Sequence, residues 1–410
     1  MGRRSLAVLL VALLGAVIAG PSADAHGKDA KVTTASATSS APLPHRQRAR
    51  LKAAVVGGLR DAATPGIVVG VQTPEGMWVK ALGTANQGSL RAMRASMHHR
   101  IGSVTKTFMG TLLMQLAGDH ELSLGDTIDQ YVDGVPNGDT MTLRQVADMT
   151  SGVASYTANP AFTDALYSNP EQRWRPSQLL EFGFPDSPEF PPGTAFQYSD
   201  SNYILLGLAI QQAAGKPLRA VLRERVIDPL DLRQTSWPGG SIALPRPHAR
   251  GYTLQGQPSD DPADATNWSP SYAWAAGAMI STVDDLLAYG RALGTGEGLL
   301  APAQQKRRLA SFGDLPPLSP QLSYGIGLVD DRGWLGHTGQ VPGFTTAVYH
   351  HPGIDTTIVV EANSDIPTGD CPGQQTLTDD PFDGQCALTA DRIMGSVAAA
   401  LGRPYDLPPG

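Results

Sequence analysis

Hydrophobic positions recur along this chain with two different periods, and the period changes four times. A helical spacing over residues 45–59 gives way to two short apolar runs at 66–71 and 77–82, separated by a Pro-Glu-Gly turn. Runs of this length joined by a tight turn predict a β-hairpin. Helical spacing then dominates the middle of the chain, with capping residues at several starts. The predicted helices there are 108–117, 143–149, 203–214, 218–226 and 282–293.

Strand patterns return towards the end of the chain, at 334–337, 345–349 and 356–361, before a last amphipathic helix at about 388–401. Strands at both ends with helices between them predict an α+β fold. We expect one antiparallel sheet assembled from both chain ends and flanked by helices. Within a domain of residues 45–402, a mostly helical lobe at about 110–270 would be inserted. A ligand cleft is expected between the two lobes.

The first residues have the pattern of an export signal. Arg3 and Arg4 precede an apolar run, and small residues flank a cleavage point before His26. This pattern predicts a signal peptide over 1–25 and a secreted or cell-envelope protein, with an uncleaved membrane anchor as the alternative. Residues 26–44 are rich in Ala, Ser, Thr and Lys without apolar periodicity, which predicts a flexible tether.

Composition narrows the function classes. The formal net charge of -7 is spread along the 410 residues, so we expect no nucleic-acid partner. No His-Glu-x-x-His motif occurs, and we expect neither a cofactor nor a metal ion. The two cysteines, Cys371 and Cys386, form an even pair at short spacing in a predicted export product, which favours a disulfide.

The tetrapeptide Ser103-Val104-Thr105-Lys106 opens the most apolar predicted helix. Ser and Lys three residues apart share one helical face, so an amine lies near a hydroxyl whose proton it can accept. A serine in the first turn also has a backbone N–H without an intrahelical partner, which can stabilise an oxyanion. A cap serine beside a solvated lysine fits the tetrapeptide as well.

Two further motifs favour the catalytic interpretation of Ser103 and Lys106 over a cap serine beside a solvated lysine. A Pro-Gly turn leads into Tyr198-Ser199-Asp200, and an apolar helix follows. Later, Gly336-His337-Thr338-Gly339-Gln340 lies on a strand flanked by glycine, where a substrate backbone can approach closely. The tripeptide Tyr167-Ser168-Asn169 resembles the first of these motifs, but Pro170 follows at once, and we assign it to a loop.

Ser-x-x-Lys, Tyr-Ser-Asp and His-Thr-Gly in this order resemble the serine β-lactamase/DD-peptidase superfamily, in particular its D-alanyl-D-alanine carboxypeptidases and class C β-lactamases. The resemblance covers nearly the whole chain after residue 44 and implies a β-lactamase/transpeptidase-like fold. It implies Ser103 as nucleophile, Lys106 as its proton partner and Tyr198 as proton shuttle to the leaving group. The substrate-binding residues that it implies are Asp200, His337, Thr338, Gly339 and Gln340, and the N–H groups of Ser103 and Gln340 would form the oxyanion hole.

Two positions depart from the family pattern. The Tyr-Ser-Asp motif ends in Asp200 where relatives usually carry Asn, and a carboxylate accepts hydrogen bonds but does not donate them. Asp200 therefore changes how a substrate amide is recognised, and favours a protonated Lys106 or a cationic substrate group. Met149 stands where relatives often carry His, which we interpret as a structural change.

The resemblance implies acyl transfer to water through an acyl-serine. The expected substrate is a small D-Ala-D-Ala-type peptide of the cell wall, with peptidoglycan as a candidate partner and β-lactams as inhibitors or poor substrates. An esterase on the same scaffold is the first alternative, because Ser-Lys-Tyr chemistry accepts esters readily. A non-catalytic envelope binding protein that keeps the fold is the second.

Overall fold

The computed structural model describes residues 41–313, 322–369, 371 and 386–406. The predicted signal peptide and most of the predicted tether lie outside these residues. The last part of that tether does not: Leu43 is only 1 % exposed, and its N–H donates to the Met77 carbonyl at 3.1 Å. The packed chain therefore begins before the predicted boundary at residue 45, because an apolar side chain can be buried there. No helix of the described residues is long and apolar enough to span a bilayer.

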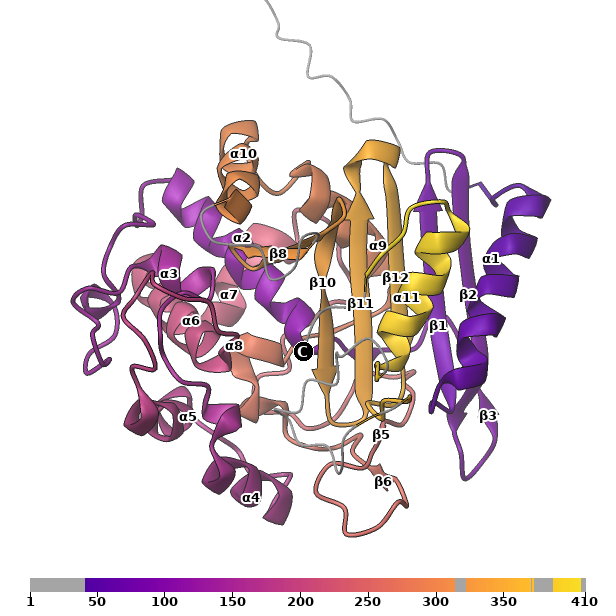
Figure 1. Ribbon diagram of the computed structural model, residues 1–410, viewed down its shortest axis with the longest axis horizontal. Coiled ribbons are helices and arrows are strands. Elements are labelled where there is room, and N and C mark those ends of the chain that lie inside the picture. Colours follow the sequence, from indigo (N-terminus) through magenta and orange to yellow (C-terminus); the bar gives the residue numbers. More distant parts are fainter. Residues whose placement is uncertain (1–40, 314–321, 370, 372–385, 407–410) are drawn as a thin grey trace, which may run out of the picture. The chain divides into compact units, whose positions relative to one another are not determined.

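An eight-stranded antiparallel sheet forms the centre of the fold, and both chain ends contribute to it (Figure 1). The order of the strands in the sheet is β3-β2-β1-β12-β11-β10-β9-β8. The strands are β1 (Gly66–Thr73), β2 (Gly76–Asn86), β3 (Arg91–Ala92), β8 (Leu322–Gly325), β9 (Leu328–Asp331), β10 (Trp334–Val341), β11 (Phe344–His351) and β12 (Thr356–Ala362). This confirms the predicted α+β fold and the predicted hairpin, in which Val71 pairs with Trp78.

Helices cover both faces of the sheet, so its central strands β1, β11 and β12 are buried along almost their whole length. On one face α1 (His45–Gly58) and α11 (Thr389–Ala400) lie side by side (Figure 1). On the other face lies α9 (Val283–Thr295). Its approach requires Gly70 on β1, where a Cβ atom would lie only 2.7 Å from a methyl carbon of Val283.

The segment between β3 and α9 is mostly helical, as predicted (Figure 1). Its helices are α2 (Thr105–Gly118), α3 (Leu143–Ala147), α4 (Pro160–Ser168), α5 (Pro176–Gly183), α6 (Asp200–Ala214), α7 (Leu218–Leu222) and α8 (Trp274–Gly277). Four short strands form two small sheets: β4 (His99–Arg100) with β7 (Ile280–Ser281), and β5 (Tyr252–Thr253) with β6 (Ala263–Asp264). After α9, α10 (Pro302–Ala310) precedes β8.

Two local predictions have opposite outcomes. Cys371 and Cys386 form the predicted disulfide. The assignment of Tyr167-Ser168-Asn169 to a loop is wrong, because Tyr167 and Ser168 form the last turn of α4. That helix begins with Pro160 after an Asn159 side chain that accepts the Ala161 N–H, a combination typical of a helix start.

Candidate active site

Ser103 lies where the helical lobe meets the sheet. It belongs to a 3-10 turn, η2 (Gly102–Val104), that runs directly into α2. The α-helix proper thus begins at Thr105, two residues after the serine expected to open it and three before the predicted range of 108–117. Gly102 makes this entry possible: its φ of +52° is left-handed, and a Cβ there would lie 2.6 Å from the Gln340 backbone nitrogen. The serine is therefore held against β10 at the start of a helix, where backbone N–H groups have no intrahelical acceptor.

Lys106 connects the nucleophile to the rest of the site. Its side chain is fully buried, and its Nζ donates to Ser103 Oγ at 2.9 Å, to Asp200 Oδ1 at 2.6 Å and to the Ala276 carbonyl at 2.9 Å. These three acceptors use all the donors of an ammonium group. Burial lowers the pKa of Lys106, and the Asp200 carboxylate acts in the opposite direction. The lysine is thus placed and tuned to exchange a proton with Ser103.

Tyr198 covers this pair from the side that is open to solvent. Its ring centroid lies 4.9 Å from Lys106 Nζ, and 37 % of the residue is exposed. Met149 shapes the segment that carries it: the Met149 carbonyl accepts the Gln197 N–H at 3.0 Å, and the Met149 sulfur lies 3.4 Å from the Ser199 nitrogen. This supports a structural role for Met149.

Strand β10 forms the opposite wall. A Cβ at Gly339 would lie 2.0 Å from the Ile101 carbonyl oxygen and 3.0 Å from the Ser103 nitrogen, so only glycine allows the strand to pass so close. Within the described residues β9 pairs with β10 only from Trp334 to Gly336. Among the described residues, no strand pairs with that edge of β10 beyond Gly336, and an unpaired strand edge is where an extended substrate backbone can add.

His337 is buried in the site, but its two ring nitrogens are occupied. Nδ1 lies 2.5 Å from the Thr338 carbonyl oxygen, which can only accept, so Nδ1 carries the proton. Nε2 is then the acceptor for the Tyr324 hydroxyl at 3.2 Å. Burial, together with the charge of Lys106, lowers the pKa of His337 to about 3. The imidazole is therefore neutral and has no nitrogen free to carry a proton to or from a substrate.

Tyr324 was not predicted as a site residue, because its segment resembles an ordinary connection of the family. It lies on the short strand β8, and its ring packs edge-on against both Tyr198 and His337, with centroids 6.0 and 5.7 Å away. Nothing in the local sequence connects Tyr324 to the His-Thr-Gly motif. Thr338 and Gln340 are half-buried on the other face of the β10 pleat.

Asp200 begins α6, and its carboxylate is held from two sides. Oδ1 accepts from Lys106, and Oδ2 accepts from the Thr157 hydroxyl at 3.1 Å. The Asp200 N–H donates to the Ser155 hydroxyl at 3.0 Å. The Asp200 side chain remains 21 % exposed, whereas that of Lys106 is fully buried. The structure thus brings Ser103, Lys106, Tyr198, Asp200 and His337 together, as the motifs predicted.

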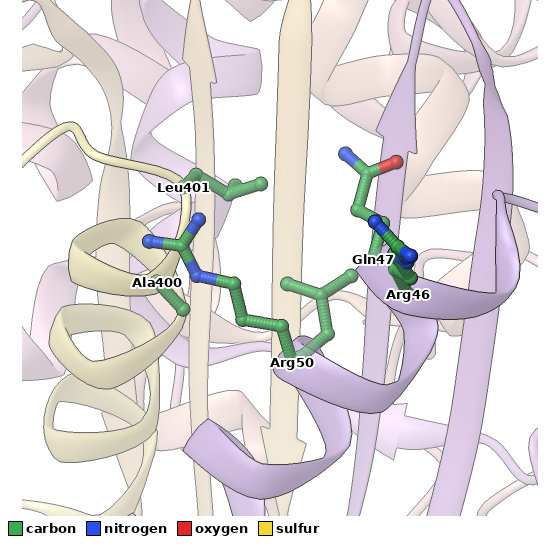
Figure 2. A pocket seen from close by; sticks show the side chains of 6 residues that line it. Arg46, Gln47, Arg50, Ala400 and Leu401 are labelled. Atoms are coloured by element: carbon green, nitrogen blue, oxygen red, sulfur yellow. The ribbon is translucent and has the colours of Figure 1, made fainter.

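A hollow of about 310 Å³ lies between α1 and α11 (Figure 2). It is lined by Arg46, Gln47, Arg50, Leu51, Ala400 and Leu401, with the Arg50 side chain lying across it. The residues that line it offer no hydroxyl, thiol or carboxylate, so the candidate active site is the one at Ser103. Within the described residues no cluster of His, Cys, Asp and Glu side chains is suited to hold a metal ion.

Comparisons with known proteins agree with this geometry. The sequence profile of the β-lactamase family matches residues 51–378. Protein flp of Staphylococcus aureus (strain MW2) is 27 % identical over 274 residues, which are 65 % of this chain and 52 % of that protein. The chain therefore spans about half the length of this curated relative.

Solved structures extend the comparison to the fold. A D-stereospecific amidohydrolase from Streptomyces sp. superposes with a TM-score of 0.71 at 28 % identity, covering 78 % of this chain and 94 % of the other. D-amino acid amidase from Ochrobactrum anthropi SV3, complexed with D-phenylalanine, has a TM-score of 0.70 at 24 % identity, covering 86 % and 99 %. This second similarity carries information on the fold alone.

Proposed function

The chain belongs to the β-lactamase family, and from this premise we propose that it is a serine hydrolase that cleaves small amides through an acyl-enzyme on Ser103. The observation that carries the proposal is the 2.9 Å contact between Ser103 Oγ and the Nζ of a fully buried Lys106. A solvated lysine beside a cap serine, the alternative from the sequence, does not fit a lysine with no exposed surface.

The reaction would proceed in two steps. Lys106 in its neutral form accepts the Ser103 proton while Oγ bonds to the substrate carbonyl carbon, and the N–H groups of Ser103 and Gln340 stabilise the oxyanion. The proton then passes from Lys106, through Tyr198, to the leaving nitrogen as the C–N bond breaks. Water activated by Tyr198 and Lys106 releases the acid and restores Ser103. His337 takes no part in these transfers, because both its nitrogens are bonded.

The charges in the site bear on the substrate. A D-alanyl-D-alanine carboxypeptidase, expected from the sequence, must bind a terminal carboxylate. Lys106, the cation next to the nucleophile, is buried with its three donors occupied, and one of its acceptors is the Asp200 carboxylate. Because this cation has no donor left for a substrate carboxylate, the site supports amides with an uncharged leaving group over peptides with a free carboxylate. The similarity to a D-stereospecific amidohydrolase also supports amide substrates.

An esterase is the second candidate, and one observation favours it. With His337 unable to donate, only Lys106 and Tyr198 remain to protonate a leaving group. An ester needs less of this assistance than an amide, because an alkoxide or phenolate leaves more easily than an amide anion.

Hydrolysis of D-alanine p-nitroanilide and of p-nitrophenyl acetate tests these proposals. Release of p-nitroaniline by the parent and not by Ser103→Ala supports the amidase. Hydrolysis of the ester alone favours the esterase. If neither compound is turned over and Ser103→Ala binds substrates as the parent does, the protein is a binding protein and the proposal is wrong.

We also propose that the protein acts outside the cytoplasm, on compounds of the cell envelope. The Cys371–Cys386 disulfide supports export, because such bonds persist in oxidising compartments. N-terminal sequencing of protein recovered from culture medium tests this, with His26 as the expected first residue. Protein that stays in the cytoplasm with Met1 intact would contradict it.

A further inference from the structure

Asp200 has acceptor capacity that the protein does not use. A carboxylate offers about four lone-pair sites. Among the described residues, the side-chain contacts that reach it are those of Lys106 to Oδ1 and of Thr157 to Oδ2. The Asp200 side chain is 21 % exposed, whereas that of Lys106 is fully buried, so part of the Asp200 side chain remains accessible to a ligand.

The side-chain hydrogen bonds at Asp200 are all donated to its carboxylate. The Thr157 hydroxyl donates its single proton to Oδ2, so the 2.7 Å contact between Thr157 and Ser155 must have Ser155 as donor. Ser155 in turn accepts from the Asp200 N–H. This closed ring of three residues fixes the carboxylate in one orientation and offers a ligand an acceptor, but no donor.

The distance from the nucleophile fits the α-nitrogen of an amino acid. Ser103 Oγ and Asp200 Oδ1 both contact Lys106 Nζ, so their separation cannot exceed the sum of 2.9 Å and 2.6 Å. In an aminoacyl group the α-nitrogen lies ~2.5 Å from the carbonyl carbon that Oγ attacks. A substrate bound for attack on its carbonyl therefore brings its α-nitrogen into the neighbourhood of Asp200.

We propose that Asp200 forms a subsite for the free α-ammonium of the substrate's acyl residue, and that the enzyme selects amides of unblocked amino acids. This rests on the proposed acyl-serine chemistry at Ser103. An ammonium donates to the unused lone pairs of the carboxylate. An N-acylated substrate keeps one neutral N–H at this nitrogen but loses the positive charge, and it adds a carbonyl oxygen for which the Asp200 carboxylate has no donor.

An ammonium bound at Asp200 would also affect the protonation of Lys106, the proposed base. The reaction needs Lys106 without its proton, which leaves the Asp200 carboxylate without a cationic partner. A substrate ammonium at Asp200 supplies that partner, and its positive charge beside Lys106 disfavours the lysine's own protonated form. Binding of an unblocked substrate thus helps to produce the basic form of the lysine that attack requires.

The test compares D-phenylalanine p-nitroanilide with its N-acetylated form at a pH below ~7, where the substrate amine is protonated. We expect kcat/KM for the free form to exceed that for the blocked form by ~10- to 100-fold, the range for a charge-assisted hydrogen bond. Asp200→Asn should remove or reverse this preference. The ratio removes the effect that the substitution has on Lys106 in the free enzyme, because that effect applies to both substrates.

Two further variants control for charge and for structure. Asp228→Asn removes the same charge at an exposed position. Arg225, three residues earlier, contacts Gln115, which lies at the opposite end of α2 from Ser103. Thr157→Val removes one contact to Asp200 but keeps the carboxylate. Both should retain the preference for the free amine. Loss of the preference in Thr157→Val as complete as in Asp200→Asn would assign it to loop structure and overturn the proposal.

Other outcomes separate the subsite from the chemistry. Hydrolysis of both forms by the parent without discrimination overturns the subsite and leaves the amidase intact. Hydrolysis of neither form rejects the amidase, and binding of D-phenylalaninamide against its N-acetyl form then decides on the subsite: equal affinities overturn it. A fluorescent penicillin, whose side chain is N-acylated, should label Asp200→Asn faster than the parent. Equal labelling of the two also overturns the proposal.

Discussion

Replacing Gly339 by alanine perturbs the contact on which the oxyanion site depends. The added Cβ would lie 2.0 Å from the Ile101 carbonyl oxygen and 3.0 Å from the Ser103 nitrogen. Carbon–oxygen contacts in proteins are normally ~3.3 Å or longer. Strand β10 and the turn that carries Ser103 must therefore separate by more than ~1 Å, because packed backbone offers no empty space to absorb the atom.

The expected loss of activity follows from this displacement. A misplacement of ~1 Å between reacting groups costs ~100-fold in rate, and loss of one oxyanion donor costs ~100- to 1,000-fold. We therefore expect kcat/KM of Gly339→Ala to fall by ~100-fold or more. Overpacking costs only ~1–3 kcal/mol of stability, so a domain stabilised by ~5–15 kcal/mol should remain folded.

Steady-state hydrolysis of p-nitrophenyl acetate, together with thermal unfolding of each variant, measures both effects. The control is Gly57→Ala on α1, where a Cβ has no neighbour within 4 Å. In a helix this change should stabilise by ~0.5–1 kcal/mol and leave the rate as it is. If folded Gly339→Ala hydrolyses the ester as fast as the parent, the close approach of β10 does not position the oxyanion donors and the reasoning is refuted.

Three further predictions concern proton equilibria. Because attack needs neutral Lys106 and Asp200 raises the pKa of this lysine, Asp200→Asn should move the acidic limb of the kcat/KM profile for an N-acylated substrate to lower pH; an unmoved limb would argue against Lys106 as base. Burial raises the pKa of Asp365 from 3.8 to about 7. Between these two pH values the folded protein holds a proton on Asp365 that the unfolded chain has lost. The free energy of unfolding should therefore fall by up to ~4 kcal/mol as the pH rises from ~4 to ~7. Urea unfolding should show a smaller fall for Asp365→Asn, and an identical pH dependence would contradict the shift. Tyr324→Phe leaves His337 Nε2 as a buried acceptor without a partner and should lower the free energy of unfolding by ~1–3 kcal/mol, with an unchanged unfolding midpoint as the contrary result.

Local sequence patterns predicted the main strands of the sheet and the longer helices. The helices α2 and α6 have apolar residues at helical spacing, and the strands β1, β2, β11 and β12 contain short apolar runs. Strands β8 and β9 have four residues each, too few to show a period, and neither was predicted. Helix α4 was missed for a different reason: its start signals at Asn159 and Pro160 were present and not used.

The site was predictable as far as its motifs extend. Ser103, Lys106, Tyr198, Asp200 and His337 were identified by residue type and order, and the structure brings them together. Their partners were not, because the contacts join segments that no local pattern connects. Thr157 reaches Asp200 across 43 positions, and Tyr324 reaches His337 across 13. The consequence for His337, that it is neutral and fully bonded, follows only from three-dimensional contacts.

Mass spectrometry of the enzyme quenched in acid during turnover tests the central claim most directly. With a D-amino acid p-nitroanilide or ester as substrate, we predict that the protein gains the mass of the acyl group, that peptide mapping locates it on Ser103, and that Ser103→Ala gains nothing. Turnover without any adduct under conditions that trap acyl-enzymes, or an adduct on another residue that persists in Ser103→Ala, would contradict the account.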